Sequence, residues 1–285
     1  MLFPHAFLKS LRGLRRGTGA LALGVFALGL GGCAGGGPLL YPAKTLDKGE
    51  VRAVAGLSGQ ALAAGFADAF RNAEAEAARS PNTPTDATYA KGALVAAAVD
   101  PGIAPFLGAR VGIGWESEGG VSFTGRGARI DLRRGFRFGE DQEYALSIGI
   151  EGSGALYGQV QGSRLPGVTL TDLRGYGADV PVLLGYEAQG GLYMAWIGVR
   201  GGWEHDSIGP LTSDGGPGLT PSPIGLSADR FWGGGLVGAA AGFRHIHVAL
   251  ELQATYESIT GSFGGNSATL SGVALVPATA LWWDF

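Results

Sequence analysis

The chain has 285 residues, a net charge of −3, 46% hydrophobic residues and only 16% charged residues, against roughly 25% in ordinary soluble domains. This charge balance predicts no nucleic-acid partner, because such domains concentrate basic residues on one surface. The single cysteine excludes an internal disulfide framework, and after residue 30 no apolar run reaches the roughly 18 residues of a membrane-spanning helix. An apolar, charge-poor chain with 53 glycines and no collagen period fits a β-barrel in lipid.

The N-terminus has the layout of an export signal. Basic residues between Lys9 and Arg16 precede an apolar stretch, Ala20–Leu30, which is too short to span a membrane as a stable helix. The stretch ends in Leu30-Gly31-Gly32-Cys33, which resembles the lipobox of bacterial lipoproteins. The resemblance implies a covalent lipid on Cys33, added by the lipoprotein-processing machinery. An ordinary signal peptide with an incidental cysteine remains the alternative.

Three regions follow from this assignment. Residues 1–32 are the predicted signal peptide, residues 33–48 a lipidated flexible tether, and residues 49–285 a barrel. No cofactor beyond the lipid on Cys33 and no metal site is expected.

Residues 60–103 interrupt the barrel pattern. Leu62, Phe66 and Phe70 recur every four residues, which indicates an amphipathic helix over about 61–79. A proline-containing break precedes a second, alanine-rich helix over about 86–99. We expect a helical hairpin in the first outer loop, acting as a plug, a cap or a partner-binding element.

The rest of the mature chain alternates apolar and polar residues, most clearly from Ile246 to Glu257. The pattern predicts an all-β, antiparallel transmembrane β-barrel of about ten strands, with eight as the alternative if Gly125–Gly127 is not a turn. The predicted strands are Glu50–Ser58, Phe106–Trp115, Gly120–Arg126, Ala128–Phe138, Glu143–Ser153, Tyr176–Glu187, Gly191–Trp203, Arg230–Phe243, His245–Glu257 and Thr269–Asp284. A soluble periplasmic β-sandwich would show the same alternation with its apolar face inward.

The polar faces of these strands carry charges of both signs. We expect eight of them to line the lumen: Arg110, Arg129, Asp131, Arg133, Glu151, Asp179, Arg200 and Glu251. Confined charges require partners, so interlocking salt bridges are one interpretation and a selective lining is the other. A ten-stranded barrel is only slightly wider than the eight-stranded barrels that side chains fill, which argues against a large pore.

His205-Asp206 lies at the outer end of a predicted strand. The ten-stranded outer-membrane proteases, the omptins, keep a His–Asp pair in such a place, and this pair resembles it. No matching acidic pair is evident on a facing strand, and catalysis needs the orienting partner as well as the base. An outer-membrane enzyme that uses His205 and Asp206, either an omptin-like protease or a lipid-modifying barrel, is therefore the alternative to a non-enzymatic barrel.

The C-terminus carries apolar residues at alternate positions, Leu281, Trp283 and Phe285. It resembles the signal by which the barrel-assembly machinery reads outer-membrane barrels, although Pro277 departs from a regular strand. The sequence thus predicts a lipid-anchored barrel in outer-membrane lipid, with its N-terminus on the periplasmic side. We expect a narrow or plugged channel, or a structural surface protein. The sequence does not specify its oligomeric state.

Overall fold

The structure, a computed structural model, describes residues 36–79, 86–99, 101–125, 127–155, 165, 173–212 and 223–285. The predicted signal peptide and Cys33 lie outside the described residues. None of the helices in this part of the chain is long and apolar enough to cross a membrane.

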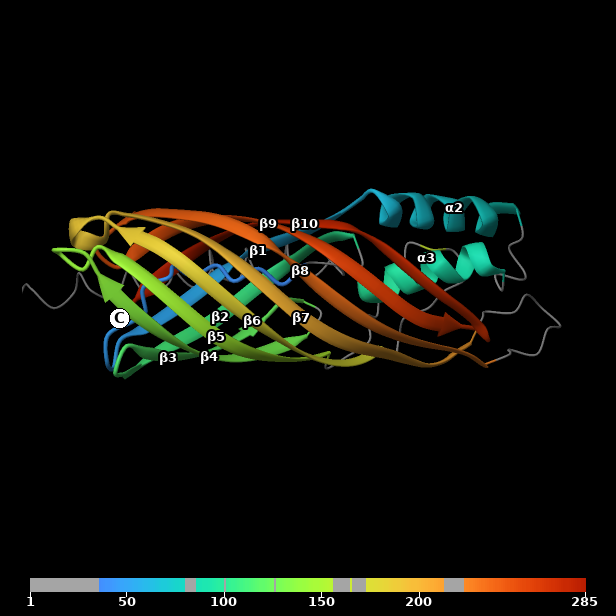
Figure 1. Cartoon of the computed structure of the whole chain (residues 1–285), viewed down its shortest axis with the longest axis horizontal. Coiled ribbons are helices and arrows are strands. Elements are labelled where there is room, and N and C mark those ends of the chain that lie inside the picture. The colour runs from blue at the N-terminus through green and yellow to red at the C-terminus, as the bar shows by residue number, and fades with distance from the viewer. Residues whose placement is uncertain are drawn as a thin grey trace, which may run out of the picture.

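Ten antiparallel strands form a closed barrel in which each strand pairs with its neighbours in sequence and β1 pairs with β10 (Figure 1). The strands are β1 (Val51–Ala63), β2 (Gly102–Gly114), β3 (Ser117–Phe123), β4 (Ala128–Phe138), β5 (Tyr144–Ala155), β6 (Leu173–Glu187), β7 (Tyr193–Thr212), β8 (Pro223–Phe243), β9 (Ile246–Phe263) and β10 (Asn266–Asp284). The predicted fold class and strand number are confirmed. The eight-strand alternative is wrong, because the Thr124 amide donates to the Gly127 carbonyl at 3.1 Å and closes a turn between β3 and β4.

The barrel wall is inverted relative to a soluble protein. Along β9, Val248, Leu250 and Leu252 are exposed on the outer surface, whereas Glu251 and Gln253 are buried inside. The soluble β-sandwich alternative is therefore wrong for this chain, because its apolar strand faces point outward.

Aromatic side chains mark both edges of this apolar outer surface. At one edge the ring of Tyr144 lies 5.7 Å from that of Phe138 and 5.4 Å from that of Tyr186. At the other edge the rings of Tyr176 and Trp203 lie 5.6 Å apart. Two aromatic bands that bound an apolar belt are the pattern of a barrel that crosses a bilayer.

The two ends of the barrel differ. Short connections close one end, which we call the short-turn end: residues 115–116, 139–143, 188–192 and 244–245. This end carries the C-terminus, and the opposite, helix-bearing end carries α2 (Gly65–Arg79) and α3 (Ala87–Ala98) (Figure 1). The short 3-10 turn η1 (Gln189–Gly191) lies within the short-turn end.

The wall is taller on one side than the sequence predicted. Residues 204–229 were expected to form a loop, but β7 runs to Thr212 and β8 begins at Pro223. Along β9 the side chains keep alternating between outside and inside, but past Tyr256 the apolar residues change sides: Ile259 and Phe263 point inward and are buried. A sequence pattern that expects apolar residues outside therefore ends the strand too early. By contrast, β3 has only seven residues, so the rim on that side is low.

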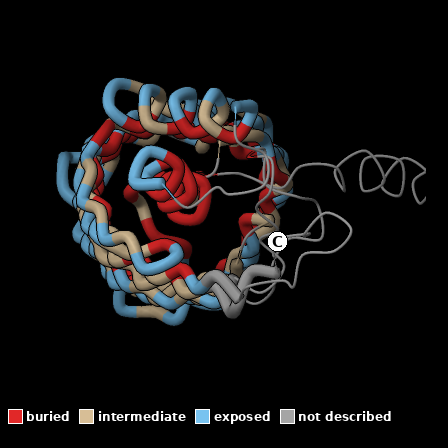
Figure 2. The backbone as a smooth tube through the Cα atoms, turned by 90° about the vertical axis from the view of Figure 1, so that its right-hand side faces the viewer, coloured by how far each residue is buried: buried red, intermediate tan, exposed pale blue. Residues whose placement is uncertain are grey.

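The helical hairpin is confirmed, and its second helix lies inside the tall wall. Viewed from the helix-bearing end, Figure 2 shows a buried helix enclosed by the ring of strands. This is α3, whose Leu94 is fully buried with Ile259 and Phe263. Helix α2 packs its Phe66 and Phe70 stripe on the same cluster, as the four-residue spacing predicted.

Candidate functional site

Residues 36–48, which we call the plug segment, lie inside the barrel. At one end the Gly36 amide donates to the Gly59 carbonyl of β1 at 3.4 Å, and the Ser58 hydroxyl donates to the Gly36 carbonyl at 2.7 Å. At the other end the Glu50 amide donates to the Asp47 carbonyl at 3.0 Å, and the chain turns into β1 at the short-turn end. The predicted flexible tether is therefore wrong for these residues, which cross the lumen in one direction.

Charged side chains of the wall hold the plug backbone. The Glu251 carboxylate accepts hydrogen bonds from the amides of Leu39 and Leu40 at 2.8 and 2.9 Å. Glu118 accepts from the Leu46 amide at 2.8 Å. The plug segment contains no strand, and buried backbone groups need partners, so the wall supplies the bonds that a sheet would otherwise provide.

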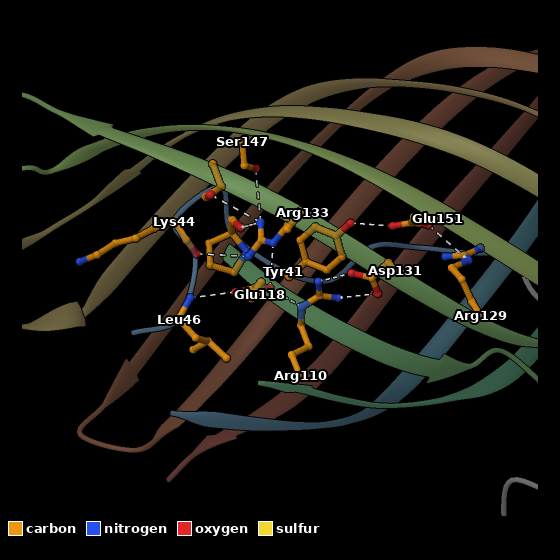
Figure 3. A network of polar contacts seen from close by, with 12 residues as sticks. Tyr41, Lys44, Leu46, Arg110, Glu118, Arg129, Asp131, Arg133, Ser147 and Glu151 are labelled. Atoms are coloured by element: carbon orange, nitrogen blue, oxygen red, sulfur yellow. Dashed lines mark hydrogen bonds and ion pairs between the residues drawn. The ribbon is translucent and has the colours of Figure 1, made fainter. Parts of the chain in front are cut away.

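Arginines bind the plug carbonyls in the same way. Arg133 donates to the carbonyls of Pro42 at 2.5 Å and Lys44 at 3.2 Å (Figure 3). Arg129 donates to the Pro38 carbonyl at 3.2 Å. Carboxylates thus meet the amides and guanidinium groups meet the carbonyls, which fixes the register of the segment in the lumen.

Tyr41 occupies the centre of this network (Figure 3). Its ring lies between two guanidinium groups, 4.0 Å from that of Arg110 and 4.3 Å from that of Arg133. Its hydroxyl donates to the Glu151 carboxylate at 2.6 Å. Cation–π contacts and a charge-assisted hydrogen bond therefore act on one buried side chain.

The eight lumen charges expected from the sequence all point inward, and seven of them fall into two linked groups. In the first group Arg110 binds both Asp131 and Glu118, and Arg133 binds Glu118 at 2.8 Å. In the second group Glu151 binds Arg200 at 2.7 Å, and Arg200 binds Asp179 at 2.7 Å. The two groups meet at the plug segment through Tyr41. Arg129 also belongs to the second group, 3.4 Å from Glu151, whereas Glu251 binds the plug amides.

Sequence reasoning missed two residues at the centre of the site, Glu118 and Tyr41. Glu118 is fully buried, yet the sequence placed it in the short turn between the predicted strands Phe106–Trp115 and Gly120–Arg126. In the structure β3 begins at Ser117, and Glu118 is its first inward residue. Pairing across the wall could have indicated it, since Arg110 and Arg133 needed a common carboxylate.

The plug segment leaves little free space in the lumen. Leu39 and Leu40 are buried against inward apolar side chains that include Phe106, Leu183 and Trp282. The cavity beside Tyr41 has a volume of about 10 Å³, at the lower limit for one water molecule. The lumen is closed at this level.

A small polar chamber of about 80 Å³ lies above the plug, toward the helix-bearing end. Gly36 and Gly37 line its floor, and Arg230, Gln253 and Glu257 belong to its walls. Arg230 binds Glu257 at 3.2 Å and also pairs with Glu204. A few water molecules would fill this space.

The structure separates His205 from Asp206. His205 is partly exposed on the outer surface, where its ring contacts Tyr176 and its Nδ1 lies 3.0 Å from the Asp229 carboxylate of β8. Asp206 is fully buried on the inner side. Adjacent strand residues face opposite sides, so the two cannot act as a dyad. Among the residues that the structure describes, no three His, Cys, Asp or Glu side chains group as in a metal site.

The C-terminal strand β10 shows its alternate apolar residues to the outside. Leu281, Trp283 and Phe285 are exposed, and the last two rings stack at 5.8 Å. Pro277 lies where the β1–β10 ladder is interrupted, since Ser58 pairs with Ala278 and the next pair along the ladder is Ala61 with Leu275. Proline has no N–H to donate, and the Gly59 carbonyl of β1 accepts from Gly36 of the plug.

The sequence matches no protein-family model and no curated protein. Similar solved structures include Neisserial surface protein A, with 11% identity and a TM-score of 0.31, covering 83% of this chain and 96% of that one. A major outer membrane protein from Thermus thermophilus has 10% identity and a TM-score of 0.30, covering 82% and 99%. The CymD monoaromatic hydrocarbon channel has 9% identity and a TM-score of 0.27, covering 84% and 89%. These neighbours are bacterial outer-membrane β-barrel proteins, and the likeness concerns the fold alone.

Proposed function

We propose that this chain is a lipid-anchored outer-membrane β-barrel that is closed by its own N-terminal segment and works as a non-enzymatic surface protein. The observation that carries the proposal is the plug segment. Glu251, Glu118, Arg129 and Arg133 bind its backbone at several levels of the lumen. A barrel filled in this way presents its ends to partners and passes no solute through its middle.

The outer surface supports a membrane location. An apolar belt between two aromatic bands matches the hydrocarbon layer of a bilayer. The export signal with its lipobox and the alternating C-terminus support the outer membrane and a lipid on Cys33. Short turns usually face the periplasm, so we orient the short-turn end inward and the helix-bearing end outward.

The non-enzymatic part of the proposal is supported by the outward placement of His205. Asp206 lies on the other side of the wall, and within the described part of the chain this histidine pairs with the partly exposed Asp229. A base oriented by a surface carboxylate, without a matching acidic pair, lacks the arrangement that motivated the enzyme hypothesis.

Planar-bilayer conductance tests the closed lumen. We expect no conductance from the wild type and discrete openings from a variant that lacks residues 38–46. As a matched control, residues 64–101 are replaced by a short Gly-Ser turn between β1 and β2, which removes the helical hairpin and leaves the plug in place. That control should stay closed, because the block lies at the plug.

Each variant is first checked for heat-modifiable migration, the mark of a folded barrel. Should the deletion fail to fold, Tyr41→Ala keeps the chain length and removes only the central ring. Steady conductance in the wild type, or openings in the hairpin control alone, would refute the proposed closure.

A gated narrow channel is the second candidate, and one observation favours it. The plug segment makes no strand pairing with the wall, so its release would not break the barrel. Rare wild-type openings that become frequent in Tyr41→Ala would support this function over a permanently closed barrel.

A further inference from the structure

The plug segment has a direction. Its last residues lie at the short-turn end, where the Gly49 amide donates to the Gly112 carbonyl at 2.9 Å. Its first described residue, Gly36, lies at the level of Ser58 and Gly59, in the part of β1 nearer the helices. The N-terminal end of the plug therefore points toward the helix-bearing end.

Gly36 lies against β1, and with Gly37 it lines the same chamber as Thr124 and Gly127 of the low β3–β4 rim. Strand β3 ends at Phe123 and β4 begins at Ala128. Arg129, the second residue of β4, donates to the Gly37 carbonyl at 3.3 Å. On the opposite side β7 and β8, with 20 and 21 residues, continue well past this level.

The outer surface below this low rim is apolar. Ile103, Phe123 and Ile130 are exposed there on β2, β3 and β4. Phe123 and Ile130 are neighbours, because Val121 pairs with Ile130 and Phe123 with Ala128. Exposed apolar residues at the last positions of these strands place the hydrocarbon layer close to the rim. A chain that passes over this rim reaches the bilayer at once.

The described part of the chain leaves no route toward the short-turn end. The plug segment itself occupies the lumen toward the short-turn end, and the wall is a continuous ring of paired strands. Cys33 precedes Gly36 by three residues, which span at most about 10 Å. A lipid on Cys33 could not reach the leaflet at the short-turn end while the plug is in place.

We propose that the mature N-terminus emerges at the helix-bearing end of the barrel, toward which Gly36 points, so that the diacylglycerol on Cys33 inserts into the leaflet on that side. The inference rests on the lipidation proposed above. It replaces the periplasmic anchoring expected from the sequence with an anchor in the outer-facing leaflet. The barrel and its lipid would then hold the plug segment from both ends.

Site-specific proteolysis in intact cells tests the exit side. A protease site with a Gly-Ser spacer is inserted between Ala34 and Gly35, upstream of every described residue. Two matched controls carry the same site at Gly190, in the short-turn end, and at Gly265, in the β9–β10 turn at the helix-bearing end. Both glycines lie at open tips, where an added side chain would meet nothing within 4 Å. An alkyne fatty acid, fed to the cells, labels the lipid on Cys33.

We expect external protease to cut the N-terminal site together with the Gly265 site. The Gly190 site should be cut only after the outer membrane is opened. Cutting at the N-terminal site should also remove the fatty-acid label from the barrel, and Cys33→Ser should abolish the label.

The outcomes separate this inference from the proposed function. An N-terminal site that is cut together with Gly190 and not with Gly265 would overturn the exit side. If the N-terminal site follows Gly265 but both are protected in intact cells, the exit side holds and the proposed membrane orientation is wrong. If the wild type carries no label, the lipid anchor is refuted, and the cutting pattern alone decides where the chain emerges.

Discussion

Replacing Tyr41 by phenylalanine tests how firmly the plug is held. The substitution keeps the ring between Arg110 and Arg133 and removes only the hydroxyl that donates to Glu151 at 2.6 Å. A hydrogen bond to a charged group contributes about 1.5–3 kcal/mol. Glu151 keeps its contacts with Arg129 and Arg200, so the loss should stay within this range.

This free energy converts directly into plug opening. Because about 1.4 kcal/mol corresponds to a factor of ten, the ratio of released to seated plug should rise roughly 10- to 150-fold. Amide hydrogen exchange of the plug segment measures this ratio, since the amides of Leu39 and Leu40 are protected by Glu251 only while the plug is seated.

Tyr256→Phe is the matched control. Tyr256 also loses a hydroxyl, but it is exposed on the outer surface of β9 and does not touch the lumen. Its plug exchange should equal that of the wild type. If plug hydrogen exchange in Tyr41→Phe rises less than threefold, or rises equally in both variants, Tyr41 does not hold the plug in place as proposed.

Three further changes address separate parts of the molecule. Glu251→Gln leaves one plug amide facing an amide nitrogen at a cost of about 1–3 kcal/mol, and hydrogen exchange should quicken at the two bonded amides first. Leu94→Ala opens a cavity at a fully buried side chain of helix α3 and should destabilise the hairpin by about 2–5 kcal/mol; limited proteolysis of the hairpin reports this, and Lys91→Ala on the exposed side of the same helix should change nothing. His205→Ala removes a partly exposed pair with Asp229, which is worth less than about 1 kcal/mol, so the temperature of heat modification should not move.

The barrel could be predicted because each strand shows its pattern within a short stretch of sequence. Alternation with a period of two, read along segments such as Ile246 to Glu257, fixes both the strand and its outward face. The same alternation placed Arg110, Arg133 and Glu251 in the lumen. It could not say that each of them contacts the plug segment, which lies far away in the sequence.

The plug could not be predicted for the opposite reason. Residues 36–48 have no period, and glycines and two prolines make the stretch resemble a linker. Its structure comes entirely from the wall, whose carboxylates and guanidinium groups bind one amide or carbonyl after another. The only available hint was the surplus of inward charge, which a narrow lumen must pair with something.

The interruption opposite Pro277 has a consequence for how the barrel is assembled. The seam between β1 and β10 joins the first strand to the last and requires the longest loop closure in the chain, which makes it a slow contact to form. At this seam the Gly59 carbonyl is bonded by Gly36, and an empty closed barrel would leave this carbonyl and the buried Glu251 without those partners. Closure of the seam and seating of the N-terminal segment are therefore expected in one cooperative step. The wall would then close around a chain that is already in place, and the order of assembly decides whether a filled molecule results.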